Sequence, residues 1–495
     1  MIDASQTFRR NEILIAGANG FLGKVVLGLL LDRFPEFRHL HILVRPRANL
    51  TAQERFASEV LSSPALRPIV QKLGQEFVDS KISVLAGDIA EPNCGIQAAA
   101  IGKLSGRLGL IINCAGLVEF FPPADDSFRS NVDGVEHIVS LAKATGAKLL
   151  HVSTCYVCGQ ADGLVEETEP ILGFYPRRKS PDDSSFDHRE EIRYCRERIY
   201  RICDSDGRAR SKQVLQRLTD LGKQRAEHWG WVNTYTYAKS LGEQIIAADN
   251  GLEYAIVRPA IVESALRFPF PGWVEGGRTA APLVLVAIGG LRHWTVRRDA
   301  PLEVVPVDLV ASAIVTVSAL LLNGRGRSVY QLATAGVNPV LLEPLVRMLH
   351  QQSGKPGRVR FLSAEAARAR RIRLQRRIDR VQMLIAEARR TAKRTGLPGK
   401  RTLAAWGLAL RKLGLQALFR EQTLELYQPF ILDNCFVFEA ENIREAYALL
   451  SDKDRQLLPW TPEEIDWKQY WIDNQIGGIQ KWVQPEAARH WSFQA

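Results

Sequence analysis

Residues 12–23 decide the fold: Glu12-Ile-Leu-Ile-Ala16 is followed at once by Gly17-Ala-Asn-Gly20-Phe-Leu-Gly23. The first five residues form a mostly apolar run that suits a buried parallel strand. After the glycines, residues 24–34 have the pattern of a helix, and His41-Ile-Leu-Val-Arg45 forms the next strand. A strand, a glycine-rich turn, a helix and a second strand in this order indicate a dinucleotide-binding unit. The sequence therefore predicts an α/β fold, a Rossmann-type doubly wound parallel sheet.

The three glycines have separate tasks in such a turn. One permits the tight turn, one lets the backbone approach a pyrophosphate, and one lets the helix pack closely on the sheet. The pyrophosphate is expected at the helix N-terminus, where free N–H groups and the helix dipole favour anions. The predicted cofactor-binding residues of this turn are Gly17, Asn19, Gly20, Phe21, Leu22 and Gly23.

Length and composition bound the organisation of the chain. It has 495 residues, 46% of them apolar and 24% charged, which are globular values and exclude a collagen or a disordered protein. We expect residues 1–345 to form the dinucleotide-binding domain and residues 346–495 to form a smaller, mainly helical C-terminal substrate domain. A polar, helix-like insertion spans about residues 163–233. We expect it to lie over the mouth of the active site.

Cysteine usage predicts a reducing, cytoplasmic location. The count of seven is odd, and the start Met1-Ile-Asp-Ala-Ser5 lacks the basic and apolar regions of a secretory signal. Cys155-Tyr-Val-Cys158 has Cys-x-x-Cys spacing, but no second Cys or His pair accompanies it. We therefore interpret both as core cysteines rather than as zinc ligands or a redox pair, and we expect no metal. No run reaches the ~18 apolar residues of a membrane span.

The net charge of +11 is concentrated in one segment. Residues 355–412 carry 18 Lys and Arg against three acids, so the rest of the chain is slightly acidic. Five apolar positions of this segment share one helical face: Leu374, Ile378, Val381, Ile385 and Ala388. Such a basic amphipathic helix fits a solvated helix packed on the core, a contact with an anionic membrane surface or acidic substrate, or nucleic-acid binding. Because no aromatic residues interleave the arginines, we expect no nucleic-acid partner.

Several motifs resemble the extended branch of the short-chain dehydrogenase/reductase superfamily. The glycine turn has its G-x-x-G-x-x-G spacing, Gly87-Asp88-Ile89 resembles its acidic adenine contact, and Asn113-Cys-Ala115-Gly116 resembles its N-x-A-G motif beside the cofactor. Asn131-Val-Asp-Gly134 resembles its N-V-x-G motif at the start of a helix. The resemblance implies that further cofactor-binding residues are Asp88, Ile89, Asn113, Ala115, Gly116, Lys239 and Pro259.

The end of the second strand indicates which nicotinamide nucleotide is bound. NAD-binding proteins of this fold tend to place Asp or Glu there to hold the ribose 2′-hydroxyl. Here Arg45 ends the strand and Arg47 follows, with no acid between them. Since a cation suits a 2′-phosphate, we expect NADPH. The alternative is that both are surface arginines of a loop.

Two segments supply the candidate catalytic residues. Ser153-Thr154 follows the apolar strand at 149–152, at the edge of an open α/β sheet where ligands bind. Tyr235-Thr-Tyr-Ala-Lys239 places Tyr235 and Lys239 on one helix face. Hydride transfer to a carbonyl leaves an alkoxide that needs a proton, and a nearby ammonium would lower the pKa of Tyr235 towards the working pH.

Two choices among neighbouring residues complete this set. Tyr237 lies close to Tyr235 but lacks the four-residue spacing to Lys239. Alignment of the run that ends at Gly159 with the superfamily favours Thr154 over Ser153 as the hydroxyl that holds the substrate oxygen. Asn131 is the fourth expected member and would position Lys239 through water, as in the superfamily. The alternative for Asn131 is a helix cap.

Longer segments are similar to the alcohol-forming fatty acyl-CoA reductases of the male-sterility type. They are Gly20-Phe-Leu-Gly-Lys24, Val152-Ser-Thr-Cys-Tyr-Val157, Thr234-Tyr-Thr-Tyr-Ala-Lys239, Val257-Arg-Pro-Ala-Ile-Val262, Pro271-Gly-Trp273, Phe430-Ile-Leu-Asp-Asn434 and Ile465-Asp-Trp-Lys-Gln-Tyr-Trp471. The resemblance covers about residues 12–310 and 425–485. It implies substrate contacts by Ser153, Pro271, Gly272 and Trp273.

The resemblance implies NADPH-dependent reduction of a long-chain acyl-CoA thioester to an aldehyde and then to a fatty alcohol. The alternatives are a reductase that stops at the aldehyde or takes carrier-bound acyl chains, and another extended short-chain dehydrogenase acting on a sugar nucleotide or a sterol. A binding protein on an inactive reductase fold is a further alternative, which intact Thr154, Tyr235 and Lys239 disfavour. The basic segment 355–412 would hold the CoA phosphates or bind the surface of an anionic membrane. The sequence does not predict the oligomeric state.

Overall fold

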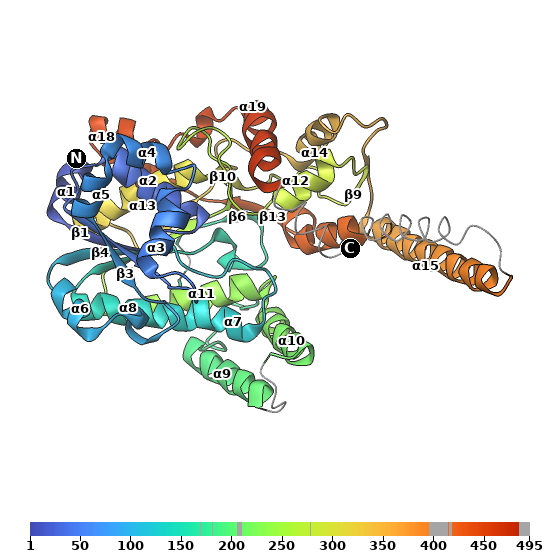
Figure 1. The fold of residues 1–495 in the computed structure, drawn as a ribbon, viewed down its shortest axis with the longest axis horizontal. Coiled ribbons are helices and arrows are strands. Elements are labelled where there is room, and N and C mark those ends of the chain that lie inside the picture. The colour runs from blue at the N-terminus through green and yellow to red at the C-terminus, as the bar shows by residue number, and fades with distance from the viewer. Residues whose placement is uncertain are drawn as a thin grey trace. The chain divides into compact units, whose positions relative to one another are not determined.

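A seven-stranded parallel sheet forms the centre of the fold (Figure 1). The computed structural model describes residues 1–168, 170–180, 182–204, 210–277, 279–395, 414 and 418–484. The strands, in the order in which they lie side by side, are β11 (Val329–Leu332), β7 (Tyr254–Pro259), β5 (Lys148–Val152), β4 (Leu108–Asn113), β1 (Glu12–Ala16), β2 (His39–Val44) and β3 (Ile82–Ala86). The predicted α/β class and parallel sheet are confirmed.

The strand order reverses direction at β1, the central strand. From β1 the chain continues to β2 and β3 on one side, then crosses to β4, β5, β7 and β11 on the other. At the carboxyl ends, Ala16 lies opposite Asn113, and Asn113 lies opposite His151 of β5. In open α/β sheets, ligands bind outside the carboxyl ends of the strands at such a reversal. From the fold we therefore expect a ligand-binding crevice between the carboxyl ends of β1 and β4.

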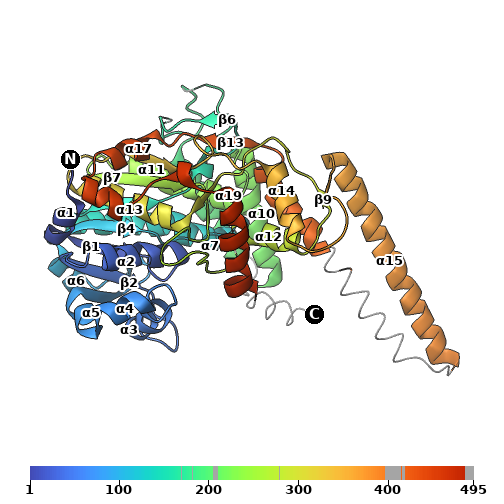
Figure 2. The same ribbon diagram turned by 90° about the horizontal axis from the view of Figure 1, so that it is seen from above.

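Helices cover both faces of the sheet (Figures 1 and 2). The helices α2 (Phe21–Arg33) and α13 (Val307–Leu322) pack together on one face, and α8 (Gly134–Thr145) and α11 (Thr234–Ala247) pack together on the other. Every residue of α13 except the last is buried. A helix that is apolar all round is a buried helix, and here α2, the sheet, α1 (Ala4–Arg10) and α17 (Glu441–Ala448) surround it.

The chain divides into two compact units that alternate along the sequence. Unit 1 is Met1–Val274, Glu303–Pro339 and Val437–Asp466, and unit 2 is Glu275–Leu302, Val340–Phe436 and Trp467–Ala495. The predicted boundary after residue 345 lies close to one of these crossings, but the sequence pattern did not show that the chain returns to unit 1.

The other elements of unit 1 are mostly short. The helices are α3 (Ala52–Arg55), α4 (Arg67–Leu73), α5 (Gln75–Lys81), α6 (Ala98–Leu104), α7 (Ala124–Phe128), α9 (His188–Asp204), α10 (Lys212–Trp229) and α18 (Asp452–Leu457). The 3₁₀ and π turns are η1 (Phe56–Leu61), η2 (Pro92–Gly95), η3 (Arg129–Asp133), η4 (Cys155–Cys158) and η5 (Pro462–Glu464). The additional strands are β6 (Asp162–Val165), β8 (Ile261–Glu263) and β10 (Val304–Pro306), and β8 pairs with β10 in parallel.

Unit 2 is mainly helical, as predicted for the C-terminal part. It contains α12 (Ala281–Ile288), β9 (His293–Trp294), α14 (Leu342–Gln351), β12 (Arg360–Phe361), α15 (Ala364–Thr395), α19 (Trp467–Gln469), η6 (Tyr470–Ile476) and η7 (Ile479–Val483). Strand β13 (Cys435–Phe438) crosses from unit 2 into unit 1. None of the helices within the described ranges combines the length and apolarity needed to span a membrane.

The basic segment contains one long helix, α15, drawn in orange in Figure 2. On its predicted apolar face Leu374, Ile378 and Ile385 are half-buried, whereas Val381 is exposed. Arg370 and Arg371 form ion pairs with Glu421 and Glu425. The prediction for residues 396–412 falls outside the described residues.

Candidate active site

The glycine turn after β1 is shaped so that only glycine fits at two positions. Gly17 has a φ of +85°, and a Cβ there would lie 2.6 Å from the backbone nitrogen of Ala115. A Cβ on Gly23 would lie 2.2 Å from the carbonyl oxygen of Gly17. Both contacts are far inside the van der Waals limit. The turn therefore packs against the loop after β4, and α2 starts close against the turn, as predicted.

The first turn of α2 presents its N–H groups at the carboxyl end of β1. Gly20 precedes the helix, and no side chain caps it. Uncapped N–H groups and the positive end of the helix dipole make such a terminus a binding place for phosphate. The tightly packed glycine turn and this helix start together form a cradle that fits the pyrophosphate of a dinucleotide.

The loop after β4 forms the opposite wall of this cradle. The Asn113 side chain accepts a hydrogen bond from the N–H of Ala115 at 3.1 Å. The buried amide of Asn131 accepts from the N–H of Leu117 and donates to its carbonyl oxygen, both at 3.0 Å. Asn131 lies inside the π turn η3 and caps no helix. It therefore fixes the backbone of the loop, and its water-mediated role toward Lys239 stays a prediction.

The residues expected to distinguish the cofactors lie at the ends of β2 and β3. Arg45 Nη1 is 3.6 Å from Asp88 Oδ2, and Arg47 donates to Glu59 Oε1 at 3.0 Å. Both arginine side chains are more than half exposed. They stand at the crevice edge with their guanidinium groups at the surface. Ile89, after Asp88, packs against the start of α8 so closely that a Cβ on Gly134 would lie 3.1 Å from it.

The two hydroxyls at the end of β5 have different surroundings. Thr154 Oγ1 accepts from the N–H of Tyr156 at 3.3 Å and lies 3.4 Å from the carbonyl oxygen of Pro259. Ser153 Oγ is buried and has no hydrogen-bond partner among the described residues. A buried polar atom without a partner is costly unless a ligand satisfies it. This orphan hydroxyl fits the expectation that a ligand contacts this edge.

Helix α11 carries the predicted Tyr-x-x-x-Lys pair. The Asn233 side chain caps the helix by accepting from the N–H of Thr236 at 2.8 Å. Further along, Arg258 of β7 donates to Glu243 Oε1 at 3.0 Å in a buried ion pair. The helix is thus held at both ends, and Tyr235 and Lys239 lie one turn apart on it.

Lys239 is bound to β5 rather than to Tyr235. Its Nζ donates to the carbonyl oxygen of Val152 at 2.6 Å and lies 3.0 Å from His151 Nε2. Burial lowers the pKa of Lys239 to about 8. Among the described residues, no hydrogen bond joins Lys239 Nζ to the Tyr235 hydroxyl, and burial raises the pKa of Tyr235 above its ordinary value. The prediction that Lys239 lowers this pKa is wrong for this arrangement, because the amine faces the strand.

The insertion forms two helices, α9 and α10, that pack against α11 and so confirm its helical prediction. Tyr237 of α11 donates its hydroxyl to Glu191 of α9. Arg225 of α10 in turn donates to Glu191 Oε1 at 2.9 Å. The Tyr237 hydroxyl therefore fastens the insertion to α11, whereas the Tyr235 hydroxyl makes no such hydrogen bond among the described residues.

The predicted substrate loop is anchored by one carboxylate. Asp308, at the start of α13, accepts from the N–H groups of Leu266 and Arg267, both at 2.8 Å. The loop then folds back, and Trp273 is buried while Pro271 is exposed. Gly272 between them has a φ of +76°, which favours glycine. Substrate contacts by these residues stay predictions.

Sequence reasoning missed four residues that shape the site: His151, Glu191, Glu243 and Asp308. His151 is a polar residue inside the apolar run of β5, and Glu243 follows Lys239 by four positions, so both carried a local signal. Glu191 and Asp308 carried none, because their partners are distant in sequence. The Cys155 thiol donates to the carbonyl oxygen of Arg258 at 2.8 Å and is buried, which agrees with its interpretation as a core residue.

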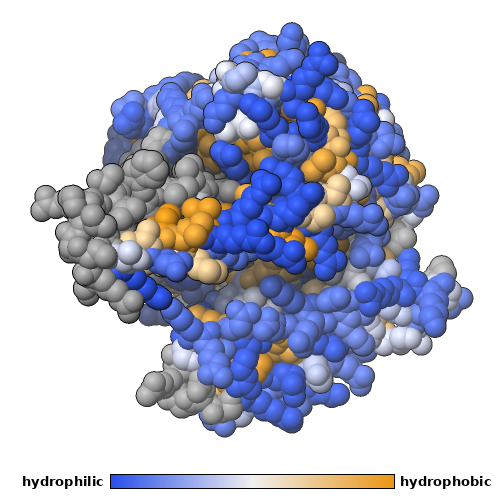
Figure 3. All heavy atoms as spheres, turned by 90° about the vertical axis from the view of Figure 1, so that its right-hand side faces the viewer, coloured by the Kyte–Doolittle hydropathy of each residue, from blue (hydrophilic) through white to orange (hydrophobic). Residues whose placement is uncertain are grey.

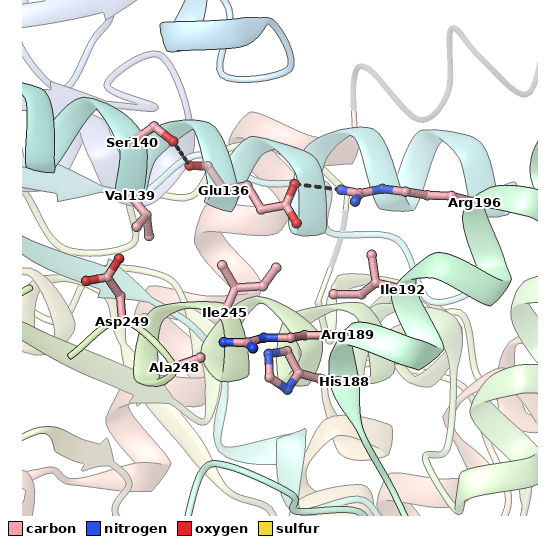
Figure 4. Close-up of a pocket in the computed structure, with 10 residues that line it drawn as sticks. All are labelled: Glu136, Val139, Ser140, His188, Arg189, Ile192, Arg196, Ile245, Ala248 and Asp249. Atoms are coloured by element: carbon pink, nitrogen blue, oxygen red, sulfur yellow. Dashed lines mark hydrogen bonds and ion pairs between the residues drawn. The ribbon is translucent and has the colours of Figure 1, made fainter. Parts of the chain in front are cut away.

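A cavity of about 350 Å³ in unit 1 lies outside this site (Figure 4). It is lined by α8, α9 and the last turns of α11, and an Arg196–Glu136 ion pair crosses its rim. Ile245, on its wall, is ten residues beyond Tyr235, or about 15 Å along the helix. None of the predicted site residues lines it.

Comparison with known proteins gives a family and a fold. Residues 15–314 match the family model described as male sterility protein. The chain is 26% identical to the probable fatty acyl-CoA reductase 5 of Arabidopsis thaliana, covering 97% of this chain and 98% of that one. It is 30% identical to the probable fatty acyl-CoA reductase 4 of the same plant, covering 69% and 70%. It is 29% identical to the alcohol-forming fatty acyl-CoA reductase of Simmondsia chinensis, covering 68% and 70%.

The solved structures agree at the level of the fold. The reductase domain of a non-ribosomal peptide synthetase from Mycobacterium tuberculosis superposes with a TM-score of 0.53 at 18% identity, covering 97% of this chain and 95% of that one. The terminal reductase domain of the myxalamid pathway gives a TM-score of 0.51 at 19% identity, covering 88% and 85%.

Proposed function

The chain belongs to the male sterility protein family, and on this premise we propose that it reduces long-chain fatty acyl-CoA to a fatty alcohol with NADPH, through an aldehyde. Its family makes it an oxidoreductase that uses a nicotinamide nucleotide and reduces fatty acyl groups. Beyond what the family shows, we propose that the nucleotide is NADPH, that the substrate is a CoA thioester and that the product is an alcohol.

One observation carries the proposal: a dinucleotide cradle and a set of proton-bearing side chains share one edge of the sheet. The glycine turn ends β1, and Ser153 and Thr154 end β5, with only β4 between them. At the usual strand spacing the two strand ends are roughly 10 Å apart. Lys239 reaches the same edge through the carbonyl oxygen of Val152. This span suits a nucleotide bound at one strand and a carbonyl reduced at the other.

The side chains divide the chemistry between them. The glycine turn and the start of α2 would hold the nucleotide, which when bound would supply the hydride that the acyl carbon accepts. The Thr154 hydroxyl holds the carbonyl oxygen, and Tyr235 donates the proton that the oxygen takes up when it becomes an alkoxide. In the first reduction the thioester carbon–sulfur bond breaks and the CoA thiol leaves. Reduction of the aldehyde to the alcohol would require a second reduced nucleotide in place of the oxidised one, and Tyr235 would again donate the proton that the oxygen takes up.

NADPH is favoured by the charge at the end of β2. Arg45 and Arg47 are exposed there, and among the described residues they form ion pairs with Asp88 and Glu59, respectively. A guanidinium can bind the 2′-phosphate through two parallel hydrogen bonds. The two arginines can leave these carboxylates to bind the dianionic phosphate at little cost in stability, because exposed ion pairs contribute little stability.

The basic helix α15 supports a contact of the cytoplasmic enzyme with an anionic membrane surface. Its sequence holds eleven Lys and Arg against three acids. Ile372, Met383 and Leu384 are exposed beside the arginines. On the face that Figure 3 shows, hydrophilic residues separate the apolar surface into patches. Charge reversal of Arg376, Arg377 and Arg380 is expected to abolish co-sedimentation with anionic vesicles, and retained sedimentation contradicts the contact.

The proposal is tested by a pair of tyrosine variants assayed with palmitoyl-CoA. Tyr235→Phe is expected to lower kcat by roughly 10²- to 10⁴-fold, the usual contribution of a general acid, with unchanged NADPH affinity. Tyr237→Phe is the matched control, because it removes a hydroxyl two residues away that faces Glu191. Full turnover by Tyr235→Phe overturns the proposal. If only carrier-bound acyl chains are reduced, the substrate is a carrier-bound thioester rather than acyl-CoA.

A further inference from the structure

A chain of three buried side chains runs along the carboxyl ends of β4 and β5 to α11. Asn113 Nδ2 lies 3.1 Å from His151 Nδ1, and His151 Nε2 lies 3.0 Å from Lys239 Nζ. All three residues are at most 4% exposed. Because water does not reach these atoms, each hydrogen bond needs one donor and one acceptor from the protein.

The backbone of Ala115 fixes the direction of the whole chain. Its N–H can only donate, and it donates to Asn113 Oδ1 at 3.1 Å. The amide nitrogen Nδ2 of Asn113 therefore faces His151, and an amide nitrogen can only donate. His151 Nδ1 must accept, so that it carries no hydrogen.

The tautomer of His151 follows from this direction. A neutral imidazole with a bare Nδ1 carries its hydrogen on Nε2. A protonated ring would turn an N–H of Nδ1 toward the Asn113 amide, where two donors would meet. Burial acts in the same direction, since it lowers the pKa of His151 well below its ordinary value. The hydrogen on Nε2 points at Lys239 Nζ.

Lys239 completes the chain as an acceptor. An ammonium has three hydrogens and no lone pair, whereas an amine has two hydrogens and one lone pair. Nζ donates one hydrogen to the carbonyl oxygen of Val152 and faces the N–H of His151. Only the amine satisfies both contacts.

We propose that His151 is a positioning residue that donates from Nε2 to Lys239 and holds its side chain as a neutral amine on the end of β5 until nucleotide and substrate bind. The amine kept there leaves Tyr235 without a neighbouring ammonium. Proton uptake by Lys239 is incompatible with the His151 contact, and it therefore accompanies release of the side chain toward Tyr235. The kinetic consequences rest on the proposed reductase function, whereas the tautomer does not.

Other titratable groups near Lys239 are accounted for. Cys114 from the loop after β4 and Glu243 from α11 act on its charge, Tyr235 lies one turn before it, and Glu243 is paired with Arg258 of β7. Five acids on elements that pack against α11 pair elsewhere: Asp125 and Asp126 with Arg210, Asp133 and Glu136 with Arg196, and Glu191 with Arg225. A hydrogen bond received by the amine stabilises the neutral form alone and lowers the pKa of Lys239 further than burial does.

The first experiment reads the tautomer without any substrate. The full-length protein is labelled with [¹⁵N]histidine, and the His151 ring is identified among the nine histidines by its loss in His151→Gln. The nitrogen shifts should show a hydrogen on Nε2 and a bare Nδ1, unchanged between pH 5.5 and 8. A hydrogen on Nδ1, or titration near pH 6.5, overturns the proposal.

The second experiment measures the pH dependence of kcat/KM in His151→Leu. If catalysis needs the ammonium, kcat/KM falls at pH values above the pKa of Lys239, and this fall is the alkaline limb of the pH profile. Loss of the Nε2 donor should move the alkaline limb to higher pH by about 1 pH unit, which is the effect of one ordinary hydrogen bond. His41→Leu is the control, because it removes another buried strand histidine whose partner is Glu12. An unmoved limb overturns the proposal.

The two experiments separate failure of this inference from failure of the proposed function. If the wild type does not oxidise NADPH with acyl-CoA, the reductase assignment falls and the tautomer measurement still decides the state of His151. If His151→Leu does not fold, His151→Gln supplies the pH profile, since its amide oxygen can accept from the ammonium and also moves the limb upward.

Discussion

The carboxyl ends of β1 and β5 lie on the same edge of one sheet but are built in different ways. At β1 the site is backbone: two glycines whose Cβ atoms would collide with neighbouring main chain, and a helix start without a side-chain cap. At β5 it is side chain: the buried Ser153 hydroxyl, the Thr154 hydroxyl, and the contact between His151 and Lys239. The first end is insensitive to protonation and intolerant of added volume. The second depends on where each proton lies.

The largest expected effect comes from adding one methyl group at the backbone-built end. Gly23→Ala brings Cβ within 2.2 Å of the Gly17 carbonyl oxygen, so the turn must open. We expect NADPH affinity, measured by fluorescence titration, to fall roughly 100-fold or more, about 3 kcal/mol. Gly102→Ala in α6 is the control, because no atom lies within 4 Å of its Cβ. Equal affinity in both variants would show that the turn does not contact the nucleotide.

A loss of stability of similar size is expected where the insertion is fastened to α11. Arg225→Met leaves the buried Glu191 carboxylate without its ion-pair partner beneath α11. Breaking a buried pair from one side costs about 3 kcal/mol. Thermal unfolding should show a lower Tm, while Lys212→Met, on the same helix and exposed, should match the wild type. A normal Tm for Arg225→Met would mean that the insertion does not stabilise α11.

A smaller effect should appear in the dependence of stability on pH. Glu303, in the loop before β10, accepts from the N–H groups of Thr334, Ala335 and Phe438, and burial raises its pKa to about 7. The pKa of this carboxyl group is near 4.5 in the unfolded state. Between pH 4.5 and 7 the folded state therefore binds a proton that the unfolded state does not. The contribution of Glu303 to stability is full below about pH 4.5 and is lost as the pH rises through 7.

The direction of this pH dependence is measured by comparing the wild type with Glu303→Gln, whose side chain cannot titrate. When the pH is lowered from 8 to 5.5, the wild type should gain on the order of 1–2 kcal/mol of unfolding free energy relative to the variant. A shift of the opposite sign, or none, would show that the carboxyl group is not protonated in the folded state near neutral pH.

The smallest expected effect concerns the cofactor's phosphate. Arg47→Ala should raise the Kd for NADPH about tenfold, near 1.4 kcal/mol, and leave that for NADH unchanged, since only the former has the 2′-phosphate. Lys103→Ala in α6 controls for the general loss of a surface cation. Equal losses for both nucleotides in Arg47→Ala would place Arg47 in the fold of the loop rather than in recognition.

The same contrast explains what could be predicted from the sequence. The predicted strand at 12–16 coincides with β1, and the helix over 24–34 agrees with α2, because apolar period and glycine spacing are local signals. The position of the Lys239 amine is not local. It depends on the sheet register that sets Asn113 opposite His151, residues 38 positions apart. The return of residues 437–466 to unit 1 is likewise set by long-range contacts.

The central claim is that the chain carries an acyl thioester through two reductions, and one ratio tests it most directly. The protein is incubated with NADPH and palmitoyl-CoA, and the NADPH consumed is divided by the CoA thiol released. The proposed chemistry predicts about two, because each hydride transfer uses one nucleotide and only the first breaks the thioester. A ratio near one would mean release of the aldehyde, and absence of NADPH consumption would contradict the assignment.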